Sequence, residues 1–107
     1  MNRPRLVQFR RYLNKRPADS LVTLVTDDKR FRDTGRSLDA YAEAWALTYF
    51  LIKQRSRQYV AYLAMLSKKK PMIWDEPKTR LAEFKAAFGD DLEALDKEFL
   101  RFMAKVR

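Results

Sequence analysis

The chain contains neither cysteine nor histidine among its 107 residues. Without cysteine it can form no disulfide, no thiolate metal site and no cysteine nucleophile. Without histidine it lacks the usual general base near neutral pH, and zinc sites nearly always use one of these two residues. The chain alone therefore lacks the residues for the commonest metal-dependent and nucleophilic chemistry.

The chain is also poor in glycine, proline and long apolar runs. Its 2 glycines and 4 prolines are too few for a fibrous, loop-rich or disordered protein. The longest apolar run, residues 44–52, is about half of the roughly 18 residues that a membrane-spanning helix needs. A hydrophobic fraction of 47% is ample for one core. We therefore expect a single domain, residues 1–107.

Negative charge is scarce, and the net charge of the chain is +9. The excess of lysine and arginine lies in residues 1–70, whereas residues 71–107 are close to neutral. This distribution is typical of a protein that binds a polyanion. It is equally typical of one part of a larger protein whose remainder is acidic.

Apolar residues recur at helical spacing, which predicts an all-α fold: a compact bundle of about five to six short-linked helices. A first helix begins near Pro4 and ends before Pro17. Residues 21–26 are rich in β-branched side chains, but the chain has no second strand-like run to pair with them. We favour a short helix there. Residues 27–36 are expected to be a polar connection.

The central helix is expected near residues 38–54, with Ser37 as its N-cap. Both sides of this segment are apolar, and a helix that is apolar nearly all round is usually buried. We therefore expect its aromatic residues to belong to the core rather than to a ligand platform. One apolar stripe along the segment consists of Leu38, Tyr41, Ala42, Trp45, Tyr49 and Ile52.

Three further helices are expected after the central one. Ser56 is placed to cap the first of them, and Pro71 ends it. Asp75 is placed to cap the second, and Gly89 to terminate it. Asp90 is placed to cap the last helix.

Two pairs of adjacent aspartates, Asp27-Asp28 and Asp90-Asp91, are candidates for acid–base chemistry. Adjacent residues on a helix or turn point apart, and both pairs stand where helix caps are needed. We interpret them as caps.

Two basic clusters are candidates for binding nucleic acid or another polyanion. One is Lys68-Lys69-Lys70, and the other includes Arg10 and Arg11 in the first helix. The alternative for the lysines is a solvated last turn of a helix, where cations interact favourably with the helix dipole. The aromatic residues near them follow core spacing and do not interleave with the basic ones, so we favour this alternative.

Residues 39–51 resemble a known family. They read Asp-Ala-Tyr-Ala-Glu-Ala-Trp-Ala-Leu-Thr-Tyr-Phe-Leu and resemble the pattern Y-A-x-A-W-A-L-x-x-F-L of an uncharacterised bacterial family. That family is similar to gluzincin-type, peptidase-MA-like zinc metallopeptidases. The segments on both sides, including residues 20–31, 59–63 and 84–92, resemble the same family.

The resemblance implies that the catalytic machinery lies elsewhere. In such proteins an H-E-x-x-H helix and a later glutamate bind zinc, and both precede the matching segment. The chain then corresponds to the C-terminal helical portion of a larger protein, and the rest of that protein is its expected partner and holds the zinc. A tyrosine downstream of the ligands stabilises the oxyanion in some gluzincins. Tyr41 has a comparable position, although its place on the apolar stripe equally fits a core residue.

Three functions follow from these observations. The first is a non-catalytic C-terminal domain that supports or lines the active-site cleft of a zinc metallopeptidase-like protein. The second is a stand-alone basic module that binds nucleic acid or another polyanion. The third is a protein-interaction domain, against which the missing repeat period counts. We favour the first.

Overall fold

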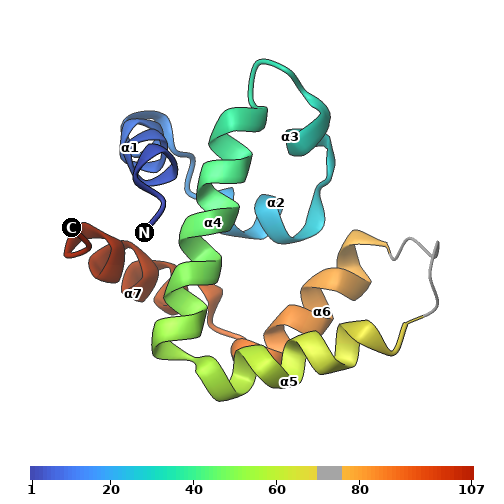
Figure 1. The fold of residues 1–107 in the computed structure, drawn as a ribbon. Helices are drawn as coiled ribbons and strands as arrows, with labels where there is room; N and C mark the ends of the chain where they lie inside the picture. Colours follow the sequence, from blue (N-terminus) through green and yellow to red (C-terminus); the bar gives the residue numbers. More distant parts are fainter. Residues whose placement is uncertain (70–75) are drawn as a thin grey trace.

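A computed structural model describes residues 1–69 and 76–107 of the protein, and in these ranges all regular structure is helical. The prediction of an all-α fold is confirmed (Figure 1). The elements in order are α1 (Arg3–Tyr12), the 3₁₀ turn η1 (Leu13–Lys15), α2 (Ser20–Thr26), α3 (Lys29–Arg32), α4 (Ser37–Gln54), α5 (Ser56–Ser67), α6 (Pro77–Phe88) and α7 (Leu92–Ala104). The described part thus has seven α-helices rather than five or six, because the expected polar connection contains the single-turn α3.

Local sequence signals account for several helix ends. Asn2 caps α1, because its side-chain oxygen accepts a hydrogen bond from the Arg5 N–H at 3.1 Å. The helical path after α1 ends with η1, before Pro17, as expected. Gly89 follows α6 with a φ of 104°, a backbone conformation that other residues rarely adopt. Residues 20–26 form a helix, as the lack of a partner strand suggested.

The predicted caps Ser37 and Ser56 are wrong by one position. Each is the first residue of its helix, and the N-cap positions belong to Arg36 and Arg55. The carbonyls of these two arginines already accept helical hydrogen bonds, which starts each helix one residue earlier. Asp90 is likewise replaced as a cap by Asp91.

Asp91 caps α7 because its side chain accepts a hydrogen bond from the Ala94 N–H at 3.0 Å. The predicted cap Asp75 and the predicted helix end Pro71 lie outside the described residues.

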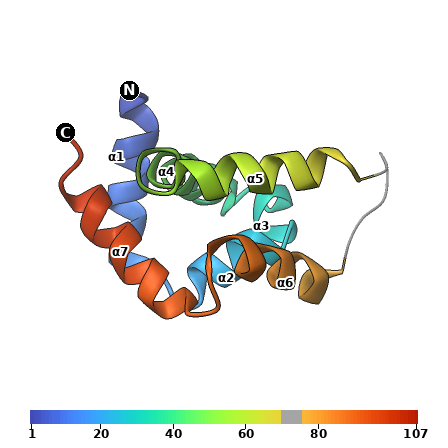
Figure 2. The ribbon, with the colours of Figure 1, turned by 90° about the horizontal axis from the view of Figure 1, so that it is seen from below.

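Helix α4 runs through the middle of the molecule (Figure 1). It contacts α1, α2, α3, α5 and α7. Helix α1 packs along one side of α4, and α2 and α3 lie on the other side. Helices α5 and α6 lie side by side in both views and extend away from α1 (Figures 1 and 2). Helix α7 brings the C-terminus back to the end of the molecule that holds the N-terminus. No helix in the described ranges is long and apolar enough to span a membrane.

Three phenylalanines from distant helices form the centre of the core. Phe9 of α1, Phe50 of α4 and Phe99 of α7 are all essentially inaccessible to solvent. The Phe99 ring centroid lies 5.5 Å from that of Phe9 and 5.6 Å from that of Phe50. These distances are within the range of favourable aromatic pairs. The core therefore joins the first, central and last long helices.

The buried face of α4 differs from the prediction. Alanines and large apolar residues of the opposite side are buried together with two carboxylates: Asp39, Ala40, Ala42, Glu43, Ala46, Leu47, Phe50 and Leu51. Of the stripe predicted to be in the core, only Ala42 is buried. Its other members form the surface that we call the α4 stripe: Leu38, Tyr41, Trp45, Tyr49 and Ile52.

The three most accessible members of the α4 stripe are Leu38, Tyr41 and Ile52, whose exposed fractions are 63%, 47% and 48%. Trp45 and Tyr49 are partly buried. The small alanine side chains on the other face let neighbouring helices approach closely, and the carboxylates of that face have basic partners there. Packing therefore left Leu38, Tyr41 and Ile52 facing solvent, whereas Trp45 and Tyr49 pack against the edge of the core.

Candidate functional site

Glu43 lies at the centre of a buried set of charged and polar side chains. Its carboxylate has an exposed fraction of 0%. One carboxylate oxygen accepts a hydrogen bond from Nε of Arg16 at 2.6 Å. The other accepts from the Ser20 hydroxyl at 2.7 Å and from Nη1 of Arg30 at 2.9 Å. Both oxygens of this glutamate are thus engaged.

The partners of Glu43 come from three different parts of the chain. Arg16 stands in the loop after η1, Ser20 is the first residue of α2, and Arg30 belongs to α3. Glu43 therefore ties three N-terminal segments to the central helix.

Tyr12 extends this arrangement to α1. Its hydroxyl lies 2.7 Å from that of Ser20 and accepts a hydrogen bond from Nη2 of Arg30 at 3.0 Å. The Arg30 guanidinium also lies over the Tyr12 ring, 5.5 Å from the centroid. Arg30 additionally donates to the Ser20 carbonyl at 3.0 Å. One arginine thus connects α1, α2 and α4 from within α3.

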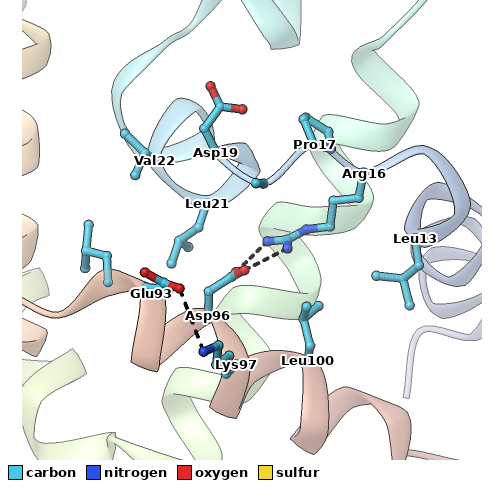
Figure 3. A pocket seen from close by; sticks show the side chains of 12 residues that line it. Leu13, Arg16, Pro17, Asp19, Leu21, Val22, Glu93, Asp96, Lys97 and Leu100 are labelled. Carbon is cyan, nitrogen blue, oxygen red and sulfur yellow. Dashed lines mark hydrogen bonds and ion pairs between the residues drawn. The ribbon is translucent and has the colours of Figure 1, made fainter.

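Arg16 extends the arrangement to the last helix. Its Nη1 and Nη2 donate to the two oxygens of Asp96 at 2.9 and 2.6 Å, a bidentate pair (Figure 3). The guanidinium lies 5.8 Å from the centroid of the Phe99 ring. Burial opposes the charge of Arg16, but its bonds to Asp96 and Glu43 outweigh burial and raise the pKa of the guanidinium. Arg16 is therefore a permanent cation between two carboxylates.

These side chains together form the Glu43 network: Tyr12, Arg16, Ser20, Arg30, Glu43 and Asp96. No buried side-chain nitrogen or oxygen in the described part of the chain lacks a hydrogen-bond partner. A network in which every member is satisfied fixes the relative positions of its helices, whereas the loss of one member leaves a buried charge unpaired. These contacts indicate that the network stabilises the fold.

The network was not foreseen from the sequence. Glu43 interrupts a run of alanines and aromatic residues on a helix that is otherwise uncharged over 40–52. A carboxylate in such a place needs a cationic partner, because an unpaired buried charge is costly. That signal indicates that a partner exists, but the sequence does not identify which of many arginines it is.

An open hollow of about 710 Å³ adjoins the Arg16–Asp96 pair (Figure 3). Leu13, Leu21 and Leu100 contribute much of its apolar wall. Glu93 and Lys97 stand at its rim, with a Glu93 oxygen 3.8 Å from Nζ of Lys97. Two pairs of oppositely charged side chains, Arg16–Asp96 and Lys97–Glu93, thus stand at the hollow.

Tyr41 lies away from the Glu43 network. It is two residues from Glu43 on α4, and such positions face different sides of a helix. Its ring makes an edge-to-face contact with Phe31 of α3, with centroids 5.0 Å apart, and the Arg5 guanidinium lies 5.5 Å from its centroid. The alternative that Tyr41 is a core residue is wrong, since nearly half of it is exposed. Its role toward an oxyanion stays a prediction.

The two basic clusters lie at different ends of the molecule. Arg10 and Arg11 belong to α1, whereas Lys68 and Lys69 follow α5, on the opposite side in Figure 1. Arg10 donates to the Val106 carbonyl. Because the clusters are far apart, they do not form a single basic surface.

Within the lysine cluster, Lys69 pairs with Glu83 of α6, and Lys68 is exposed. Lys70 lies outside the described residues. Polyanion binding by either basic cluster stays a prediction.

The described carboxylates show no arrangement for binding a metal. No group of three or more acidic residues in the two described ranges could hold a metal ion. Asp27 accepts a hydrogen bond from the Lys29 N–H at 2.9 Å, and Asp28 lies 3.1 Å from Arg80. Of the four aspartates interpreted as caps, Asp91 caps a helix through its side chain, whereas Asp28 occupies the N-cap position of α3 without a side-chain cap hydrogen bond.

The chain resembles a family of proteins over most of its length. No curated protein and no solved structure matches it. A family model described as "Protein of unknown function (DUF1570)" matches residues 1–73, which include every member of the Glu43 network except Asp96. This description assigns no activity, and the likeness to metallopeptidases belongs to the proposal below. The match covers more than half of the chain, which therefore belongs to this family of unknown function.

Proposed function

We propose that the chain is a non-catalytic helical domain that packs through the α4 stripe against another part of a larger, zinc metallopeptidase-like protein, where it supports or lines the active-site cleft. The observation that carries this proposal is the exposure of the large apolar side chains Leu38, Tyr41 and Ile52 on one face of α4. Large apolar side chains that are exposed together on one face of a protein mark a place where another surface binds.

The α4 stripe has the dimensions of an interface between helices. From Leu38 to Ile52 it extends about 21 Å along the axis, at about 1.5 Å per residue. The side of α4 that holds the stripe carries no charged side chain between Leu38 and Ile52. A helix face of this kind buries apolar area when another helix packs on it, and such burial is the main favourable term in association.

The Glu43 network supports the non-catalytic part of the proposal. The glutamate of the family-like segment is fully engaged with Arg16, Ser20 and Arg30. A carboxylate held in this way, away from solvent, is not free to take a proton from a substrate or water. In the proposal this segment therefore stabilises the domain and takes no part in catalysis.

The zinc of the proposal belongs to another part of the larger protein. The residues of this chain do not fit the ion, because it has no histidine or cysteine and no described cluster of carboxylates that could bind a metal. The metallopeptidase assignment rests on the resemblance of residues 39–51. Tyr41 belongs both to that segment and to the α4 stripe, and in the proposal it is the side chain nearest to the cleft.

Single-cysteine labelling tests the proposal directly, because the chain itself has no cysteine. Ile52→Cys places a thiol on the α4 stripe, and Val60→Cys places one on the exposed face of α5 as a matched control. In the isolated chain we expect both thiols to react at similar rates with a maleimide, read out by peptide mass spectrometry. In the longest product of the gene we expect the Ile52→Cys thiol to react at least tenfold more slowly.

The same preparations test the metallopeptidase assignment. We expect the longer protein to contain one zinc ion and to cleave peptides, and the isolated chain to do neither. Equal labelling of Ile52→Cys in both proteins would remove the docking role. A longer protein without zinc would restrict the proposal to docking alone.

A further inference from the structure

We propose that the partner of the α4 stripe is an amphipathic helix whose apolar side chains are flanked by carboxylates. This inference rests on the proposed docking role of the stripe and adds the chemistry of the surface that covers it. Its basis is the distribution of charge around the stripe.

The acidic residues of α4 are turned away from the α4 stripe. Asp39 and Glu43 are both buried on the opposite face of the helix. Asp39 accepts a hydrogen bond from Gln8 at 2.8 Å and lies 3.1 Å from Nζ of Lys15, and Glu43 belongs to its own network. The exposed face of α4 therefore carries no negative charge from its own helix.

Two cations stand at the α4 stripe without a carboxylate partner. The Arg5 guanidinium lies 5.5 Å from the centroid of Tyr41, and the Lys53 ammonium lies 5.7 Å from that of Tyr49. Among the described residues no carboxylate pairs with either cation. Tyr41 and Tyr49 are about 12 Å apart along the helix axis, at about 1.5 Å per residue. The stripe thus has a positive charge near each of two positions separated by roughly two helical turns.

The neighbouring helix α1, which holds Arg5, does not offset this positive charge. It contains no acidic residue. A partner with exposed lysine or arginine would meet like charges here, whereas carboxylates would be attracted. Among the apolar surfaces that fit the α4 stripe, those flanked by carboxylates should therefore bind more tightly than those flanked by lysine or arginine.

A helix fits the stripe better than a nucleic acid does. The aromatic rings at its centre already contact one another, with Trp45 and Tyr49 stacked at 5.5 Å and Tyr49 at 6.0 Å from Phe102. Bases bind single-strand-binding proteins by stacking on free aromatic faces. The ends of the stripe are aliphatic, Leu38 and Ile52, and such side chains pack against the apolar face of a helix at i, i+3, i+4 and i+7.

Two designed peptides test the inference on the complete 107-residue chain. Both carry leucines at i, i+3/i+4 and i+7 of an 18-residue amphipathic helix, and they differ only at two flanking positions eight residues apart. One peptide has glutamates there and the other has lysines. We expect the glutamate peptide, labelled with fluorescein, to bind at least tenfold more tightly by fluorescence anisotropy, with affinity that falls as salt rises.

A charge exchange in the protein gives the reciprocal test. The double variant Arg5→Glu/Lys53→Glu should reverse the preference, so that the lysine peptide binds more tightly. The control variant Arg57→Glu/Lys78→Glu makes the same change of net charge at exposed positions of α5 and α6 and should leave the preference unchanged.

The outcomes separate this inference from the docking role. Equal binding of both peptides, no binding, or the same loss in the control variant would overturn the acidic helix. A thymidine oligonucleotide that binds the wild-type chain, but not Arg5→Glu/Lys53→Glu, would overturn it in favour of a polyanion. If neither peptide binds while the Ile52→Cys thiol is protected from labelling in the longer protein, the docking role is supported and the acidic partner helix is excluded. Free labelling of that thiol would remove both.

Discussion

The Arg16 guanidinium lies 2.6 Å from a carboxylate oxygen of Glu43, although 27 positions separate the two residues in the chain. The same guanidinium binds Asp96, which is 80 positions away from Arg16. This side chain thus connects the beginning, the middle and the end of the protein. The pair stands within the buried Glu43 network, whose stability depends on every member being present.

Replacing Glu43 by glutamine should strongly destabilise the fold. Glutamine keeps the shape of the side chain but leaves Arg30 without a carboxylate partner and Arg16 with Asp96 alone. We expect a loss of about 3–5 kcal/mol in the free energy of unfolding, a large share of the stability of a small domain. Urea denaturation followed by circular dichroism at 222 nm measures this loss.

The matched control is Glu93→Gln, which removes the charge of an exposed carboxylate that lies 3.8 Å from Nζ of Lys97. It should change the free energy of unfolding by no more than about 0.5 kcal/mol. If the change caused by Glu43→Gln were equally small, the network would have no structural role.

Gly89→Ala should also destabilise the protein, for a reason that lies in the backbone. A β-carbon at position 89 would meet no atom within 4 Å, but the φ of 104° is strained for any residue with a side chain. Such strain costs about 1–3 kcal/mol. Gly35→Ala has no such φ and should change the melting temperature much less. Equal shifts of the melting temperature for the two variants would contradict this explanation.

Tyr62→Phe should make the protein less sensitive to alkaline pH. Burial, helped by the nearby charge of Glu83, raises the pKa of the Tyr62 phenol above its ordinary value of 10. The unfolded chain therefore loses this proton at lower pH than the folded protein does. The contribution of Tyr62 to the free energy of unfolding is therefore fully present below pH 10. It is lost as the pH rises through the pKa of the folded state.

The phenylalanine variant removes the ionising group and retains the ring contacts of Tyr62 with Phe84 and Phe88. Denaturation curves at pH 9 and pH 11 measure the effect. The difference between the two pH values should be smaller for Tyr62→Phe than for wild type, and Tyr41→Phe serves as an exposed control. An unchanged difference would show that Tyr62 does not contribute.

The position of the α4 stripe can be checked by stability alone. Leu38→Lys should change the free energy of unfolding by about 0.5 kcal/mol or less, because the side chain is mostly exposed. Leu47→Ala, on the buried face of the same helix, should cost about 2–5 kcal/mol. Thermal denaturation of the isolated chain compares the two. A larger loss for Leu38→Lys would mean that the stripe is internal.

Much of the fold was predictable from local signals. The helix over 20–26 followed from the lack of a partner strand, and the end of α6 at Gly89 followed from glycine's freedom of conformation. The capping predictions at Ser37 and Ser56 failed by one residue, because backbone hydrogen bonds from the preceding arginine carbonyls decided where each helix starts. Helix type is a local property, whereas helix ends also respond to their surroundings.

The candidate site was much less predictable. Tyr41 was identified from the resemblance, and the structure places it on the exposed stripe with Phe31 and Arg5. The pairing of Glu43 with Arg16 and Arg30 was missed, because a sequence does not say which of many charges meet after folding.

By itself, the sequence determined the helical class, the absence of histidine and cysteine chemistry, and the excess of positive charge. These properties depend on residue types and on short-range spacing, and both can be determined without knowing the fold. Only the tertiary structure decided which face of α4 is buried and which charges meet inside. The helix is apolar nearly all round, so both of its faces were suitable for the core. Contacts between distant segments made the choice: small alanines admitted the neighbouring helices, and Glu43 found its arginines on the same side.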